Sequence, residues 1–280
     1  MTRGRRLCSA TALAAGLLVL WTLPVRPSAR PPVLRVCSDP NNLPFSNRAE
    51  QGFENRLAGL IAAELGAEVR YTWWAQRRGF VRNTLGAGAC DLIAGVPAGY
   101  ELVATTEPYY RSTYVFVTRR DLTPPLESID DPRLRRLRLG VHVIGDDYAA
   151  QPPVNALARR GIVSNVRGYS IYGDYREPNP PARLVEAVAK GDVDVAVVWG
   201  PLGGYFAGRE AVPLRVTPMR ERGDGPGTPF VFAIAMGVRR GDTALARRIG
   251  AVLDRRRGEV RRILEEYDVP LVPDRAGGTT

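Results

Sequence analysis

Between Val33 and Tyr267 short apolar runs alternate with helical repeats, and this alternation limits the possible folds more than any other feature. The runs "VLRVCSD" (33–39), "EVRYTWW" (68–74) and "CDLIAGV" (90–96) are typical of buried strands. The segment "GFENRLAGLIAAELG" (52–66) places Leu57, Leu60, Ile61 and Leu65 on one helical face, and "RGFVRNTLGAG" (78–88) is a further helix candidate. Such alternation predicts an α/β protein with a mostly parallel sheet that helices cover on both faces.

The pattern breaks at "DLTPPLESIDDPR" (121–133) and then starts again. Strands are expected in "LRLGVHVIG" (137–145) and "DVDVAVVWG" (192–200), with helices in "PPVNALARRG" (152–161) and "PARLVEAVAKG" (181–191). After the loop "RERGDGPGTP" (220–229) the strand "FVFAIAMGV" (230–238) has no place left in this second unit. We therefore expect it to return to the first unit, followed by an amphipathic helical pair from Asp242 to Tyr267.

These patterns predict two Rossmann-like lobes that two crossing strands connect. The first lobe takes residues 30–118 and 229–270, the second lobe takes residues 119–228, and residues 271–280 form a tail. The N-terminal residues 1–29 combine three early arginines, an apolar run from Leu7 to Leu23 and small residues near Ala29, which is typical of a secretion signal. An uncleaved membrane anchor is the alternative, because the apolar run nears the length of a spanning helix.

Charge narrows the choice of partners. The formal charge is +10, and loss of residues 1–29 with their four arginines leaves 10 − 4 = +6. Lys190 is the only lysine, so nearly all positive charge is guanidinium, which favours bidentate contacts with carboxylates or phosphates. An exported chain without basic and aromatic residues interleaved is not expected to bind nucleic acid, and an acidic protein surface is the better partner.

The cysteines and the single histidine restrict the chemistry. An oxidising compartment permits a bridge between Cys37 and Cys90, but Cys37 lies late in its predicted strand and Cys90 at the start of another. We therefore favour two buried thiols over a disulfide. With His142 alone, inside an apolar strand, neither a zinc site nor a serine–histidine triad can be assembled. Asp39, Asp146 and Asp147 are suitable oxygen donors for calcium or a lanthanide, but such acids are more often caps, so no metal site is predicted.

Five blocks of sequence carry a family resemblance. They are "VCSDPNNLPFSN" (36–47), the helix 52–66, "YTWWAQRRGFVRNTL" (71–85), "CDLIAGVPAGYELVATTEPYYRSTYVFV" (90–117) and "VWGPLGGYFA" (198–207). The layout resembles type II periplasmic solute-binding proteins, and the blocks resemble the quinoprotein-dehydrogenase-associated group of J proteins (MoxJ and XoxJ types). This resemblance implies a two-lobed fold, a periplasmic location and a link to a dehydrogenase that uses pyrroloquinoline quinone (PQQ).

One feature of the amino-acid-binding members is missing. The resemblance implies that an arginine before the Pro-Tyr pair should hold the ligand carboxylate with two charge-assisted hydrogen bonds. Here the region before Pro108-Tyr109 reads "GVPAGYELVATTE" (95–107) and contains no arginine, with Gly99 near the expected position. Arg111 lies beyond the pair and is expected to point elsewhere. The sequence thus predicts a cleft that does not bind amino acids tightly and has no arginine cluster for PQQ, so no cofactor is expected.

The expected cleft is aromatic and polar. Parallel strands place ligands at their carboxyl ends. The residues predicted there, for a ligand or a partner, are Asp39, Asn41, Asn42, Phe45, Trp74, Gly95, Val96, Tyr109, Tyr110, Gly145, Asp146, Asp147 and Trp199. For the loop 38–47 turn chemistry is an equally good explanation. Strand alternation sends Trp73 and Trp74 to opposite faces, so one of them is expected in the core.

Three functions compete. The first, which we favour, is a non-catalytic accessory factor for maturation or activation of a PQQ-dependent methanol or alcohol dehydrogenase. The second is the binding protein of an ABC transporter for a small uncharged solute. The third is an enzyme, which ranks last because a dehydratase needs a carboxylate-binding arginine and a transglycosylase needs a further domain.

Overall fold

The computed structural model describes residues 31–143, 151–170, 175–219 and 229–273. The predicted signal peptide at residues 1–29 lies outside these ranges, as does most of the predicted tail. Within the described ranges no helix combines the length and the apolar character that a membrane crossing requires.

Parallel strands build the first part of the main sheet. β1 (Val33–Ser38) lies between β4 (Glu68–Trp73) and β5 (Leu92–Pro97), parallel to both. β12 (Val231–Val238) then pairs antiparallel with β5, which confirms that this strand returns to the first unit. The short β6 (Ala104–Thr105) also pairs with β12.

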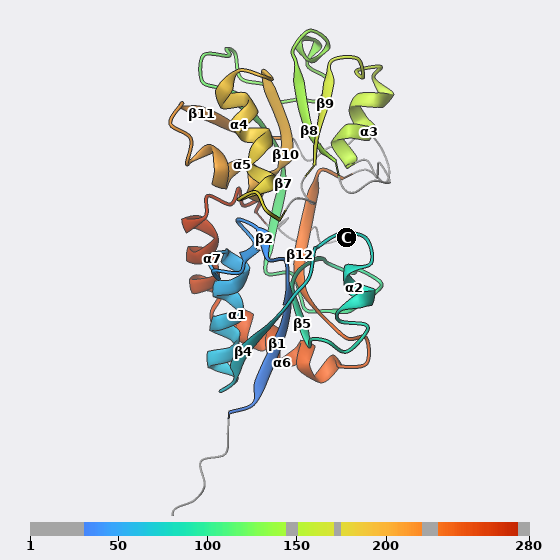
Figure 1. The fold of residues 1–280 in the computed structure, drawn as a ribbon, viewed down its shortest axis with the longest axis vertical. Helices are drawn as coiled ribbons and strands as arrows, with labels where there is room; N and C mark the ends of the chain where they lie inside the picture. The colour runs from blue at the N-terminus through green and yellow to red at the C-terminus, as the bar shows by residue number, and fades with distance from the viewer. Residues whose placement is uncertain (1–30, 144–150, 171–174, 220–228, 274–280) are drawn as a thin grey trace, which may run out of the picture. The chain divides into compact units, whose positions relative to one another are not determined.

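One long strand joins the two parts of the sheet. β7 (Tyr110–Arg119) pairs through its first residues with β12, and from Tyr114 onward with β10 (Val195–Trp199). β8 (Leu139–Val143) and β9 (Val166–Ser170) extend the sheet beyond β10, while β11 (Leu214–Pro218) also pairs with β7. Figure 1 shows β7 and β12 running between the two groups of strands. This confirms the expected two-lobed α/β fold with two crossing strands, whereas the exact lobe boundaries stay a prediction.

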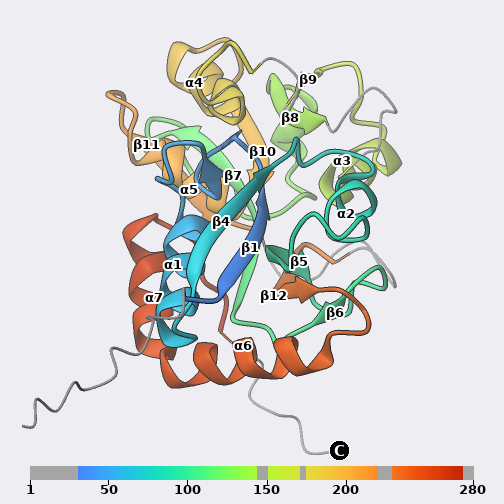
Figure 2. The ribbon, with the colours of Figure 1, turned by 60° about the horizontal axis from the view of Figure 1, so that its bottom comes forward.

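The helices follow the apolar patterns in most places. α1 (Phe53–Glu64), α6 (Thr243–Arg255) and α7 (Arg257–Glu266) pack beside the first group of strands, as Figure 2 shows. α3 (Pro152–Arg159), α4 (Arg183–Lys190) and α5 (Gly200–Ala207) pack against the second group. The predicted helix at 78–88 is a single turn, α2 (Phe80–Asn83), before which Gly79 adopts a φ of 84°. Short 3-10 helices span Pro132–Arg135 and Pro180–Ala182, and β2 (Asn41–Asn42) forms a hairpin with β3 (Ser46–Asn47).

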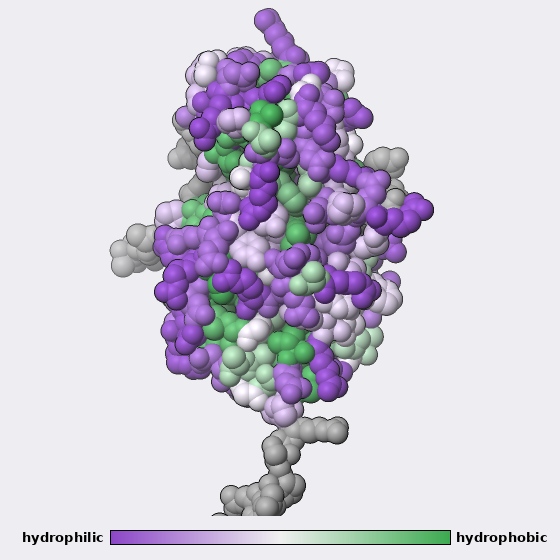
Figure 3. All heavy atoms as spheres, turned by 60° about the vertical axis from the view of Figure 1, so that its left-hand side comes forward, coloured by the Kyte–Doolittle hydropathy of each residue, from purple (hydrophilic) through white to green (hydrophobic). Residues whose placement is uncertain are grey.

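The arginine-rich C-terminal run is solvated helix surface, as its amphipathic pattern predicts. Arg257 pairs with Asp254 at 2.8 Å and Arg261 with Glu265 at 2.7 Å, and all four side chains are at least half exposed. The face drawn in Figure 3 is mainly hydrophilic, and its hydrophobic atoms lie in small separate areas. The ion pairs and the hydrophilic face agree with a solvated surface for these helices.

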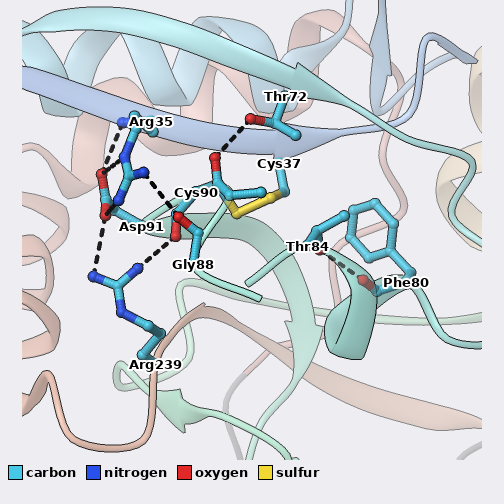
Figure 4. The surroundings of a disulfide bond; sticks show 10 residues. Arg35, Cys37, Thr72, Phe80, Thr84, Gly88, Cys90, Asp91 and Arg239 are labelled. Atoms are coloured by element: carbon cyan, nitrogen blue, oxygen red, sulfur yellow. Dashed lines mark hydrogen bonds and ion pairs between the residues drawn. A yellow bond between two sulfur atoms is a disulfide. The ribbon is translucent and has the colours of Figure 1, made fainter. Parts of the chain in front are cut away.

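The expectation of two free thiols is wrong: Cys37 and Cys90 form a disulfide, with their Cα atoms 5.6 Å apart. The error lies in where the third strand begins. β5 starts at Leu92, opposite Val36, so Cys90 precedes the strand instead of occupying its first position. The residues before Cys90 cross over the sheet, where Thr72 Oγ1 donates a hydrogen bond to the carbonyl of Ala89 (2.8 Å). Figure 4 shows that this path brings Cys90 against Cys37.

Candidate functional site

A cavity of about 330 Å³ opens where the crossing strands meet the carboxyl ends of β5 and β10. Its lining residues come from segments far apart in the sequence: Asn42, Phe45, Glu54, Gln76, Gly95, Val96, Pro97, Tyr110, Tyr114, Gln151, Trp199, Leu202, Phe232 and Ile234. The volume is at the small end of the usual range for small-molecule sites. Because β7 and β12 supply part of the wall, both groups of strands contribute to the same site.

Five of the fourteen lining residues are aromatic, and their rings are held by contacts with other rings. On one side Tyr114, Trp199 and Phe232 make mutual edge-to-face contacts, with ring centroids 5.3 to 6.3 Å apart. On the other side Phe45 and Tyr110 both contact the fully buried ring of Phe53, at 5.3 and 6.1 Å. Edge-to-face pairs at these distances are favourable, so the wall is formed without a ligand.

Glu54 is the one carboxylic acid among the described residues that line this cavity. It is the second residue of α1, and its side chain is only 7% exposed. Burial, with a smaller contribution from the charge of Asp39, raises the pKa of Glu54 to about 8. Among the described residues its carboxyl group has no hydrogen-bond or ion-pair partner. An acid held in this way is neutral in much of the free protein at pH 7.

Gly95 in β5 makes room for that carboxyl group. A Cβ atom at this position would clash with Oε1 of Glu54, so every residue other than glycine would displace the acid. The carboxyl group therefore lies against the backbone of β5 at the carboxyl end of the strand, where open α/β sheets bind ligands.

Asn42 is a further polar residue of the cavity lining. Asn42 uses its side-chain amide Nδ2 to donate to Oε1 of Gln76 (3.1 Å). Its own Oδ1 is buried and has no partner in the described part of the chain. Among the described residues of the lining there is no arginine, lysine or histidine. A ligand carboxylate would find no positive side chain in this described part of the wall.

The side chains of Asp39 and Asn41 make hydrogen bonds within the protein and do not line the aromatic cavity. The carboxylate of Asp39 accepts hydrogen bonds from the backbone N–H groups of Asn41 (2.8 Å) and Gln76 (2.7 Å) and from the hydroxyl of Tyr175 (3.2 Å). Burial raises the pKa of Asp39, and these hydrogen bonds counteract the rise. The side chain of Asn41 donates to the carbonyl of Glu177 (2.8 Å) and accepts from the backbone N–H of Asn179 (3.2 Å). Together these contacts connect the loop after β1 to the segment 175–179.

The remaining predicted site residues are distributed over three places. Trp73 and Trp74 both line a second, outer cavity of about 610 Å³, so the expectation that one of them lies in the core is wrong. Trp74 is 45% exposed, and Trp73 stacks on Tyr71 at 4.6 Å. Tyr109 donates its hydroxyl to the carbonyl of Ala94 (3.0 Å) and lines neither this outer cavity nor the aromatic one. Gly145, Asp146 and Asp147 lie outside the described residues.

Six predicted residues meet in the aromatic cavity: Asn42, Phe45, Gly95, Val96, Tyr110 and Trp199. The sequence reasoning missed Glu54, although a signal was present. Glu54 lies three, four and seven residues before Leu57, Ala58 and Ile61, so the helical period places this acid on the buried face of α1. Gln76, Gln151 and Phe232 gave no comparable signal, because only the tertiary fold brings them to the cavity.

Comparison with known proteins agrees with this architecture. Residues 34–268 match the model of the bacterial extracellular solute-binding proteins, family 3. Protein MoxJ of Methylorubrum extorquens is 33% identical over 86% of this chain and 82% of its own length, and Protein MoxJ of Paracoccus denitrificans is 28% identical over 86% and 89%. The crystal structure of the periplasmic binding protein XoxJ from Methylobacterium extorquens AM1 superposes with a TM-score of 0.71. It shares 37% identity over 86% of this chain and all of that one.

Proposed function

The chain belongs to the bacterial extracellular solute-binding proteins of family 3, and within them to the MoxJ and XoxJ type; from this premise we propose a periplasmic accessory role in methanol oxidation. In this role the protein assists maturation or activation of a PQQ-dependent methanol or alcohol dehydrogenase and has no catalytic activity of its own. The similarity to MoxJ and XoxJ over most of the chain carries the proposal.

The outer cavity supports a protein partner. It is lined by Trp73, Trp74 and Tyr175 together with Arg48, Arg77 and Arg176, and Glu177 is the only acid among the lining residues that the structure describes. The guanidinium of Arg48 lies over the ring of Trp73, 6.0 Å from its centroid. Aromatic side chains and arginine are the residues that concentrate affinity in protein interfaces. This surface suits an acidic patch on a partner, which agrees with the positive charge of the chain.

Deletion of the gene tests the proposal. We expect the deletion strain to make normal amounts of the dehydrogenase polypeptide but to show lower dehydrogenase activity, and a plasmid copy should restore the activity. A strain that keeps full dehydrogenase activity and loses uptake of one solute would refute the accessory role.

The aromatic cavity favours one alternative, a receptor function for a small solute. Five aromatic residues line it, its volume suits a small molecule, and its described lining has no positive group of the kind that the carboxylate of a free amino acid requires. A ligand that survives purification of the periplasmic protein, identified by mass spectrometry of the denatured sample, would support this alternative.

A further inference from the structure

Glu54 occupies a position that the rest of the chain does not explain. Burial of a carboxyl group is unfavourable unless partners replace the water it loses, and buried acids are therefore normally paired. Asp39, in the same lobe, follows that rule with three donors. Glu54 is equally enclosed but has no such donor among the described residues, and it lines an open cavity.

A second acceptor lies in the same cavity. Oδ1 of Asn42 is buried without a partner in the described part of the chain, because the amide nitrogen of that side chain is committed to Gln76. The cavity thus offers a carboxyl group and an amide oxygen as acceptors. A ligand that satisfies them must bring N–H or O–H donors.

The rings add a preference for positive charge. Phe45, Tyr110, Tyr114, Trp199 and Phe232 present aromatic surface around the cavity that Glu54 enters. The face of an aromatic ring attracts a cation within about 6 Å, and it does so most strongly where water is excluded. None of the lining residues that the structure describes is an arginine, lysine or histidine. An aromatic enclosure that contains an acid is a composition that proteins use to bind organic cations.

We propose that this cavity binds a small alkylammonium ion, with the ammonium group on Glu54 and Asn42 and the alkyl group against the wall that Trp199 and Phe232 form. The proposal concerns a ligand of the cleft and does not depend on the accessory role. It also differs from the solute-receptor alternative above, in which the solute is uncharged.

Binding of a cation should release a proton. With a pKa of about 8, Glu54 is mostly neutral at pH 7, and a bound ammonium group favours its ionised form. Affinity should therefore rise about tenfold between pH 7 and pH 9, as the cost of ionising Glu54 disappears. The titratable groups that face Glu54 are Asp39, Tyr71, Tyr109 and Tyr110, and burial raises the pKa of each of the three tyrosines above the ordinary value of 10.0.

Three probes of nearly the same shape separate charge from size. Isoamylammonium carries the cation, isoamyl alcohol is its neutral analogue, and leucine is the same amine with a carboxylate added. We expect calorimetry of the protein purified from the periplasm to show isoamylammonium binding at least about tenfold more tightly than either of the others. At pH 7 the enthalpy should depend on the ionisation enthalpy of the buffer, with a slope close to one released proton.

Variants assign the effect to the acid. Glu54→Gln keeps the shape of the side chain and removes its charge, so we expect at least about tenfold weaker binding of isoamylammonium and no proton release. Glu68→Gln removes the same charge from an exposed position on β4 and should change neither result. Far-ultraviolet circular dichroism of both variants checks that the fold is retained, and Gly95→Ala, which displaces the carboxyl group, gives an independent test.

The results can overturn the proposal in three ways. Equal binding of isoamyl alcohol would mean a site for uncharged solutes. Tight binding of leucine would mean that a positive group outside the lining holds the carboxylate. No binding of any probe at millimolar concentration would mean that the cavity is not an ammonium site. None of these outcomes changes dehydrogenase activity in the deletion strain, so the accessory role is tested separately.

Discussion

Loss of the bridge between Cys37 and Cys90 should destabilise the protein strongly. The bridge closes a loop with a sequence separation of 53 residues. In the chain-entropy description, opening a loop of this length lowers the free energy of unfolding by about 4 kcal/mol. That is a large part of the 5–15 kcal/mol that typically stabilises a whole protein. A chain that begins at Arg30, which omits Cys8, isolates the effect.

Urea unfolding of Cys37→Ala and of the double variant with Cys90→Ala measures the loss. The single variant already opens the loop, so it should lose most of the stability, and the second substitution should cost less than about 1.5 kcal/mol more because only a small buried group is removed. Thiol titration of the denatured, unreduced parent chain should find no free thiol. Two free thiols, or a loss below about 1 kcal/mol in both variants, would refute the reasoning.

Three further outcomes follow from the site. Glu54→Gln should gain stability relative to the parent chain as pH rises from 5 to 8, by up to about 1.4 kcal/mol per pH unit. The reason is that the raised pKa of Glu54 makes the folded parent hold a proton that the unfolded chain releases. A difference in free energy of unfolding, measured with urea, that is the same at every pH would contradict this. Trp74→Ala should weaken binding to the apo-dehydrogenase by at least about 1 kcal/mol in surface plasmon resonance, whereas Leu102→Ala, an exposed apolar control, should not. Asn41→Ala removes the side-chain contacts to Glu177 and Asn179, so hydrogen exchange of the segment 175–179 should accelerate without global unfolding.

The fold could be predicted because its signals are local and repeated. The alternation of strand and helix periods identified β1, β4, β8 and β10 to within three residues at each end, and the absence of a place in the second unit assigned β12 to the first. The helix α5 was harder to predict, because its sequence "GPLGGYFA" contains three glycines and has little helical propensity. Its apolar face packs on β7 and β10, and that tertiary contact outweighs the weak local preference.

The alternation of strands and helices could predict neither the disulfide nor the role of Glu54 in the cavity. A two-residue error in the start of β5 was enough to separate Cys37 from Cys90, since the distance between them depends on how the chain crosses the sheet. Tyr110 shows that a residue can be placed correctly while its burial is not predicted. The sequence places it in the cleft, but it is only 7% exposed, so it lines the cavity and belongs to the hydrophobic core as well. Replacing Tyr110 with alanine would disturb the packing of Phe53, so Trp74 is the better probe of a docking surface.

Asp39 and Glu54 show why the type of residue alone does not identify a binding site. Both are buried acids of the first lobe near the same cavity, and burial raises the pKa of both. Asp39 receives donors from the loop after β1, from the residues after β4 and from Tyr175, so its charge is used within the protein to join these segments. Glu54 receives none from the described residues, and Gly95 leaves space for it at the cavity wall. The cost of burying Glu54 is therefore one that a ligand from outside the chain can offset, and a positively charged donor offsets it best.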